Sequence, residues 1–237
     1  MTELIFNDVS NIDIGILLKN EKIDIPAPER DISEITIPGR DGVLHKDNKR
    51  YRPISFDAGF NFKDLENTEE VFRKVKKWLR GSGELSLSYD IDYFYKVTNI
   101  ELNSYKHTHT RVAEFSATFT AEPFQYLKVG KAPILNPNEL YNSGYESKPI
   151  YKLTGEGLCE LIVNGNSIKV NVGQNVIIDT ERLLCYKQNG QNVNTSVTGD
   201  ISKLTLKEGS NSIYCKKDFE LEVIPNWRCI YFSTRKN

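Results

Sequence analysis

The chain has little of what catalytic and metal sites are usually built from. Its 237 residues include three histidines, four cysteines and one methionine. None of the cysteines forms a C-x-x-C pair, so the close spacing typical of a zinc site is absent. No G-x-x-x-x-G-K, G-x-G-x-x-G or nucleophile-elbow pattern occurs either. The sequence therefore gives no positive evidence for an enzyme, and it predicts no catalytic residue, cofactor or metal.

An excess of charge of one sign is also missing. The formal net charge is −1, with 18 basic and 21 acidic residues up to Gly130 and 13 basic and 11 acidic residues beyond it. Tight binding to nucleic acid depends on neutralising phosphates with Lys and Arg. Because neither half carries a basic excess, we expect no tight nucleic-acid binding.

Long hydrophobic runs are the third absence. No apolar segment approaches the roughly 20 residues that span a bilayer. Residues Met1–Ser10 alternate apolar and polar side chains and include Glu3 and Asp8, unlike a signal peptide. We therefore expect neither a membrane span nor a cleaved signal.

The cysteines all fall in the second half, within apolar, strand-like runs. The simplest interpretation is buried free thiols in a protein made in a reducing cytoplasm. Their even number leaves a disulfide open as the alternative. The residues are Cys159, Cys185, Cys215 and Cys229.

Two polar clusters could carry chemistry, and each has a simpler interpretation. His107 and His109 would share one face of a strand and could hold a metal, but the polar run 103–111 predicts a solvated hairpin tip. The spacing of Asp90 and Asp92 resembles the carboxylate pair with which glycosyltransferases hold a divalent cation. Without a nucleotide-binding segment, it predicts a polar turn between a strand ending at Tyr89 and one beginning at Tyr93. His45 has no candidate nucleophile near it in sequence.

One helix is predicted after residue 67. Asn67 and Glu70 have the spacing of a capping box, and Gly81 suits the position just after a helix end. Between them, apolar residues recur at spacings of three and four and form one stripe. The stripe consists of Val71, Phe72, Val75, Trp78 and Leu79.

Most of the first half reads as strand around this helix. Apolar and polar residues alternate strictly over 54–62 and 113–120, which indicates strands with one buried face. Glu122-Pro123 is predicted to end the last of these strands. Shorter candidates are Leu4–Phe6, Glu34–Ile37, Glu84–Tyr89 and Tyr93–Leu102. Residues 1–129 are expected to form a first domain, a sheet structure with the helix packed against it.

The second half, 130–237, is expected to be an all-β domain. It opens with a Pro- and Gly-containing boundary stretch, 130–149. The Asn164-Gly165 pair between two apolar runs is the strongest hairpin signal in the chain. Further turns are predicted at Asn189-Gly190 and Gly209–Asn211. Predicted strands are 158–163, 167–172, 176–179, 183–186, 203–206, 212–215 and 219–224, a pattern typical of a β-sandwich or jelly roll.

Pro38-Gly-Arg-Asp-Gly42 predicts a tight turn between strands from which Arg40 projects. It resembles the P-G-R-D-G segment common in the N-terminal domain of distal tail (Dit) proteins of siphophages. The order of later segments agrees with that family. In the first half these are Trp78–Gly81, Gly83–Ser88, Asp90–Tyr95 and Ala121–Phe124; in the second half they are 142–144, 148–150, 163–165, 178–181 and 208–213.

The resemblance implies an N-terminal β-sandwich plus helix that closes into a hexameric ring with a central channel for DNA, and a C-terminal galectin-like jelly roll. The ring would join the tail tube protein to the tail-tip protein and anchor peripheral baseplate or receptor-binding proteins. It would be assembled in the host cytoplasm and reside at the virion tail tip. The residues proposed for inter-subunit contact are Gly39, Arg40, Asp41 and Gly42.

A host-surface carbohydrate-binding module is the alternative function. The galectin-like fold invites it, but the second domain contains no histidine, and its one tryptophan, Trp227, lies near the C-terminus. The galectin sugar site therefore cannot be carried over to this sequence, since fold alone does not imply function.

Overall fold

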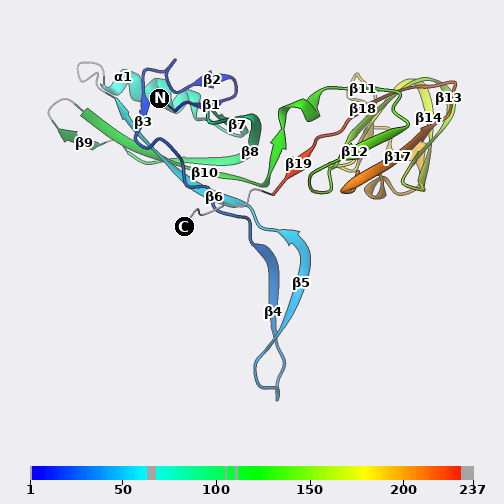
Figure 1. Cartoon of the computed structure of the whole chain (residues 1–237), viewed down its shortest axis with the longest axis horizontal. Coiled ribbons are helices and arrows are strands. Elements are labelled where there is room, and N and C mark those ends of the chain that lie inside the picture. Colours follow the sequence, from blue (N-terminus) through cyan, green and yellow to red (C-terminus); the bar gives the residue numbers. More distant parts are fainter. Residues whose placement is uncertain (1, 63–67, 105, 110–111, 231–237) are drawn as a thin grey trace. The chain divides into compact units, whose positions relative to one another are not determined.

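A computed structural model describes residues 2–62, 68–104, 106–109 and 112–230. The described residues form two compact units, one comprising the chain up to Gln125 together with Ile230, and a second comprising Tyr126–Cys229. Strands dominate both units, and the described residues contain one α-helix. The predicted fold class, mainly β with one packed helix, is confirmed (Figure 1).

The first unit is built on one antiparallel sheet. Along the sheet the order is β2, β1, β7, β8, β10, β6 and β3, with β9 also pairing with β10. The bounds are β1 Leu4–Phe6, β2 Val9–Ser10, β3 Leu17–Leu18, β6 Ile54–Phe62, β7 Gly83–Leu87, β8 Asp90–Leu102, β9 Lys106–His109 and β10 Val112–Leu127.

β6 and β10 are neighbouring strands of this sheet. They pair from Ala113↔Phe62 to Ala121↔Ile54 without interruption. The buried residues of β6 alternate with more exposed ones, which confirms the two-residue period seen in the sequence. The Phe60 and Phe115 rings stack at 5.0 Å between centroids, so the paired strands present one aromatic face to the core.

Helix α1 (Thr68–Trp78) covers that face. Its buried residues include the predicted stripe members Val71, Phe72, Val75 and Trp78. The Phe72 ring meets Phe115 edge-on at 5.5 Å. The helix stops at Trp78, and Gly81 follows with φ +83°, a left-handed conformation suited to glycine. The predicted cap, Asn67, lies outside the described residues.

The second unit is built around two long strands. β13 (Ile150–Val163) and β14 (Asn166–Asp179) pair over their full length. Asn164 (φ +51°) and Gly165 (φ +80°) join them, as the Asn-Gly signal predicted. The remaining strands are β11 Ile134–Leu135, β12 Glu139–Asn142, β15 Leu184–Tyr186, β16 Val197–Thr198, β17 Gly209–Cys215, β18 Glu220–Ile224 and β19 Arg228–Cys229.

The second edge of β13 is shared by two strands. Its first part pairs with β18, and its last three residues pair with β17. Gly155 and Gly157, both at positive φ, lie between these two segments. A Cβ at Gly155 would lie 2.5 Å from the Phe219 ring, so glycine lets that ring pack directly on the strand.

A buried amide organises the loops at one end of this unit. Asn211 is fully buried, and its Nδ2 lies within 3.3 Å of the carbonyl oxygens of Leu140, Lys207 and Gly209. Its Oδ1 accepts hydrogen bonds from Lys207 N and Asn164 Nδ2, at 2.8 and 2.7 Å. This one side chain therefore links β12, the 207–209 loop and the β13–β14 turn.

The structure corrects two predictions in the first unit. β10 does not end at Glu122-Pro123 but continues to Leu127. Asp90 and Asp92 lie within β8 rather than in a turn, because Leu87 pairs with Asp90 around a tight turn at 88–89.

The 103–111 segment is not simply a hairpin tip either. It includes β9, which pairs with β10.

Three further corrections concern the second unit. Gly209–Asn211 begins strand β17 and is not a turn. The predicted strand 203–206 is a 3₁₀ turn, Ile201–Lys203, followed by an isolated bridge at Leu206. The predicted strands 167–172 and 176–179 are parts of the one strand β14.

Candidate functional site

A projecting hairpin is the most distinctive surface feature of the first unit. It consists of β4 (Arg30–Thr36) and β5 (Val43–Tyr51), which pair with each other as a separate two-stranded sheet. In Figure 1 this hairpin, here called the arm, extends away from the main sheet and from α1. An isolated two-stranded hairpin is only marginally stable in water, so contacts at its base and along its faces decide whether it holds its shape.

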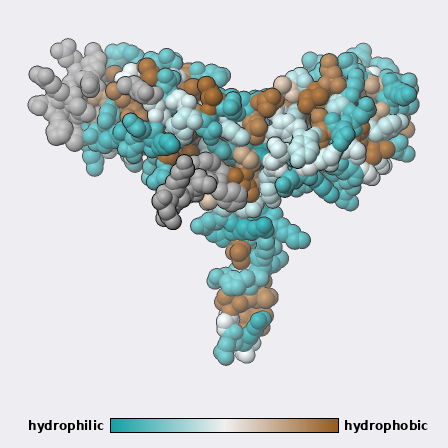
Figure 2. Space-filling view, viewed as in Figure 1, coloured by the Kyte–Doolittle hydropathy of each residue, from teal (hydrophilic) through white to brown (hydrophobic). Residues whose placement is uncertain are grey.

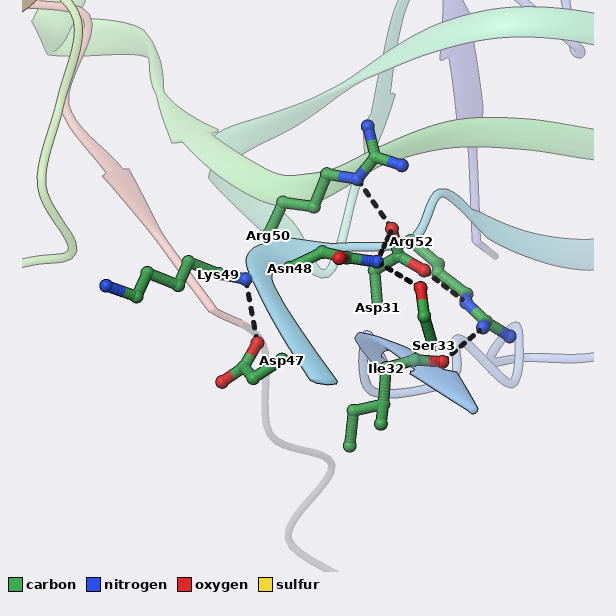
Figure 3. Close-up of polar contacts among 8 residues, drawn as sticks. All are labelled: Asp31, Ile32, Ser33, Asp47, Asn48, Lys49, Arg50 and Arg52. Carbon is green, nitrogen blue, oxygen red and sulfur yellow. Dashed lines mark hydrogen bonds and ion pairs between the residues drawn. The ribbon is translucent and has the colours of Figure 1, made fainter. Parts of the chain in front are cut away.

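The base of the arm is held by a charged cluster around Asp31 (Figure 3). The carboxylate of Asp31 accepts hydrogen bonds from Arg50 Nε at 2.6 Å and Arg52 Nε at 3.3 Å. Asn48 Nδ2 donates to both Asp31 and Ser33. The hydrogen bond from Arg50 is the main reason that the pKa of the Asp31 carboxyl lies below its usual value.

A second set of contacts anchors the arm to the main sheet. The Tyr51 ring meets Phe124 of β10 edge-on at 5.9 Å, and the Arg30 guanidinium lies 5.4 Å from the Tyr51 centroid. Arg30 also forms an ion pair with Asp47 at 3.0 Å. The arm therefore leaves the body of the unit from a fixed root.

Beyond this root the arm exposes apolar side chains. Ile35 and Leu44 are directly opposite each other, so they share one face, while Val43 lies on the other face. Exposed fractions of the apolar residues run from 39% to 43%, and the residues are Ile32, Ile35, Ile37, Val43 and Leu44. Figure 2 shows this as a hydrophobic patch on the part of the arm far from the main sheet. Exposed apolar clusters of this kind mark interaction surfaces.

All four residues proposed for inter-subunit contact lie together at the tip of the arm. Gly39 (φ +80°) and Gly42 (φ +79°) make the reversal, and Arg40 N donates to Ile37 O at 3.2 Å. The side chains of Arg40 and Asp41 are exposed. Neither forms an ion pair within the described part of the chain. The sequence-based expectation of a tight turn with Arg40 projecting is confirmed.

A second exposed apolar feature lies between α1 and the first two strands. This groove, about 380 Å³, is lined by Phe6, Val9, Ile14, Trp78 and the stems of Lys74 and Lys77. Its shape is fixed because Trp78 Nε1 donates to Phe6 O and Val9 O at 3.2 and 3.1 Å. We call it the α1 groove.

The other polar candidates are not assembled into a site. His45 lies on the exposed arm with its Nδ1 3.9 Å from Glu34 Oε1. Asp90 accepts a hydrogen bond from Gln125 Nε2 at 2.6 Å, and His107 and His109 lie on β9. Across the described ranges, no three His, Cys, Asp or Glu side chains are grouped so that they could hold a metal.

Two of the four cysteines are adjacent. Cys159 Sγ and Cys215 Sγ lie 3.6 Å apart, and no disulfide is formed. Their hydrogen bond raises the pKa of Cys159 and lowers that of Cys215. Burial raises the pKa of Cys185 to about 12.

None of the helices in the described ranges has the length and apolarity needed to cross a bilayer.

Sequence reasoning missed the apolar faces of the arm and the α1 groove. The isoleucines of β4 were visible in the sequence, but alternation alone cannot say that a strand lacks a covering layer. Trp78 was predicted to belong to the buried apolar stripe of the helix. Val9 lines the groove because of a turn in the chain before it, and no sequence motif marks that turn.

Comparison with solved structures gives an informative likeness. No protein-family model and no curated protein sequence matches the chain. Among solved structures, it is similar to the crystal structure of the Dit protein (gp 19.1) of SPP1, presented as a paradigm of the hub adsorption apparatus in phages that infect Gram-positive bacteria. The TM-score is 0.72 at 10% sequence identity, over 98% of this chain and 100% of that one. The chain therefore has the fold of a Dit protein, which confirms in three dimensions the resemblance that its sequence motifs indicated.

Proposed function

We propose that the protein is a structural component of a phage tail, a hub that works by closing into a hexameric ring around a central channel for DNA. In this proposal residues 1–129 form the ring and residues 130–237 form a galectin-like outer domain. The ring joins the tail tube protein to the tail-tip protein and carries peripheral baseplate or receptor-binding proteins. It is assembled in the host cytoplasm and resides at the virion tail tip.

The observation that carries this proposal is the arm. A subunit with a Dit-like fold places a rooted hairpin with exposed isoleucines outside its own body. Closed cyclic assemblies need a heterologous interface, in which one surface of each subunit fits a different surface of its neighbour. A projecting apolar element suits one half of such an interface.

The mass of the purified full-length protein in solution tests the ring. Light scattering coupled to size-exclusion chromatography is expected to give six times the chain mass of 27.1 kDa, with rings visible by negative-stain microscopy. A protein that stays monomeric at high concentration, and also fails to join tube or tip proteins, would contradict the proposal.

The tip residues are tested separately. Gly42→Val forces a β-branched residue to φ +79°, where nothing lies within 4 Å but the backbone itself is strained. Arg40→Ala removes an exposed guanidinium. We expect each change to weaken the ring while leaving the subunit folded, and unchanged rings from both would remove the tip from the interface.

A carbohydrate-binding role in adsorption is the second candidate, and one observation favours it. Tyr141 on β12 and Tyr214 on β17 are 73% and 51% exposed. The register Tyr141↔Ser210 places both tyrosines on one face of the strand pair, where aromatic rings could stack on sugars. Binding of the full chain to host cell walls that is lost in Tyr141→Ala and Tyr214→Ala would support this function. Equal binding by the variants would refute it.

A further inference from the structure

We infer that the arm of one subunit docks into the α1 groove of a second copy of this chain. The inference rests on the proposed ring and names the two surfaces that would meet. The arm cannot fill the groove of its own subunit. Both belong to the first unit, and the arm, rooted through Tyr51 and Phe124, points away from α1 (Figure 1).

The arm and the α1 groove match in apolar character. The arm offers a ridge, with Ile35 and Leu44 side by side across the hairpin and Ile37 next to the turn. The groove offers a hollow with an aromatic floor, Phe6 and Trp78, and an exposed wall at Val9. Burying a ridge of branched aliphatic side chains in such a hollow removes apolar surface of both partners from water.

The tip of the arm and the rim of the groove also match in charge. At the tip of the arm, Asp41 is exposed and forms no ion pair with any described residue. At the rim of the groove, Lys77 is exposed and likewise forms none within the described ranges, whereas its neighbour Lys74 pairs with Glu70 at 3.2 Å. Arg40 has an equivalent counterpart in the exposed Asp8, which follows β1 beside the groove. Each of the two tip charges, Arg40 and Asp41, thus has an opposite charge at the groove.

A third surface on the same subunit is not needed to close a ring. One arm and one groove on each copy make a head-to-tail interface, which repeats around a closed circle. A different partner protein would need its own matching ridge, whereas a second copy already has one.

Charge reversal provides the test, using the full-length protein. Asp41→Lys puts a cation opposite Lys77 of the neighbour, and Lys77→Asp puts an anion opposite Asp41. Both positions are exposed, so we expect unchanged circular dichroism and melting temperature but association weakened by about tenfold or more, because like charges would face each other. Glu34→Lys, on the face of the arm opposite to Ile35, and Arg80→Asp, just beyond α1, serve as controls that should still assemble.

Mixing the two defective variants makes the test decisive. The arm of the Asp41→Lys variant, now cationic at its tip, meets the groove of the Lys77→Asp variant, which is now anionic at its rim. The arm of the Lys77→Asp variant keeps Asp41 and meets the native Lys77 of the Asp41→Lys variant. Every interface is then complementary when the variants alternate, and an even-numbered ring such as a hexamer permits this alternation.

We expect the mixture, measured by light scattering and negative-stain microscopy, to recover rings that neither variant forms alone. The double variant Asp41→Lys/Lys77→Asp should form rings by itself, because each of its interfaces again joins opposite charges.

The possible failures are distinguishable. If the unmodified protein forms rings and both single variants do so equally well, or if mixing restores nothing, the arm–groove contact is wrong while the ring stands. If the unmodified protein forms no ring alone or with tail partners, the proposed function itself fails.

Discussion

Replacing Asn211 should lower the stability of the second unit markedly, although Asn211 is a polar residue. The side chain is fully buried and contacts three backbone carbonyls and one backbone N–H, besides the Asn164 amide. Asn211→Ala leaves these groups without a partner where water cannot readily replace it. At a net loss of about 1 kcal/mol for each contact, the free energy of unfolding should fall by about 3–5 kcal/mol.

Two further variants separate hydrogen bonding from packing. Asn211→Asp keeps the volume but places an oxygen against the three carbonyls, so the loss should be similar without any cavity. Asn189→Ala removes an exposed asparagine that accepts only from Gln191 N at 3.0 Å, and should cost about 0.5 kcal/mol or less.

Urea unfolding followed by tryptophan fluorescence measures these changes, because Trp227 packs against the core of the second unit. Hydrogen exchange over residues 205–212 localises the effect. A loss below about 1 kcal/mol in Asn211→Ala, or equal losses in Asn211→Ala and Asn189→Ala, would refute the assignment of Asn211 as the organiser of these loops.

Three other predictions concern the first unit and the thiols. Trp78→Phe removes the indole donor to two backbone carbonyls and should lower the free energy of unfolding by about 1–3 kcal/mol in a urea titration. An unchanged midpoint would contradict the conclusion that these hydrogen bonds fix the shape of the α1 groove. The pKa of Asp31 is lowered by its arginine partners, so its stabilising contribution is fully present above the usual carboxyl pKa of 3.8 and is lost as pH falls through the lowered value. Amide protection over 30–52, measured relative to the exchange rate of an unstructured chain at the same pH, should fall there, and Asp31→Asn should show low protection already at neutral pH with little further change on acidification. Iodoacetamide at neutral pH should modify Cys215, whose pKa is lowered, well before Cys185, whose pKa is about 12; mass spectrometry of digested protein that shows the reverse order would refute the burial argument.

The sequence was most informative where the spacing of apolar residues follows the period of a helix or strand with one buried face. The α1 stripe and the alternation over 54–62 were readable because one face of each element is buried and the other is exposed. The Asn164-Gly165 turn was readable because positive φ at two successive positions restricts the residue types that fit.

Other elements lacked such a signal or carried a misleading one. β5 was given no predicted range, because most of its residues are exposed on both faces and no period results. Leu204 and Leu206 alternate like strand residues and are fully buried, yet only Leu206 forms a bridge. Asn211 looked like a turn residue, although it is buried through hydrogen bonds rather than apolar contacts.

The extension of β10 has a similar explanation. Its pairing with β6 ends at Ala121, so Pro123 lies beyond the stretch where a missing N–H would break that ladder. The candidate site was half predicted: the tip turn was readable as a motif, but the groove depends on contacts between segments about 70 residues apart.

The two Asn-Gly turns should deamidate at different rates. Deamidation at such a pair requires the asparagine side chain to swing onto the following backbone nitrogen and form a cyclic imide. Asn164 cannot do this easily, because its amide is held by Asn211 Oδ1 at 2.7 Å and by Ser212 N at 3.0 Å. Asn189, whose side chain is exposed, accepts a hydrogen bond from Gln191 N and from no other residue that the structure describes. In stored protein, chemical damage should therefore accumulate at the surface loop, while the long central hairpin keeps its original chemistry.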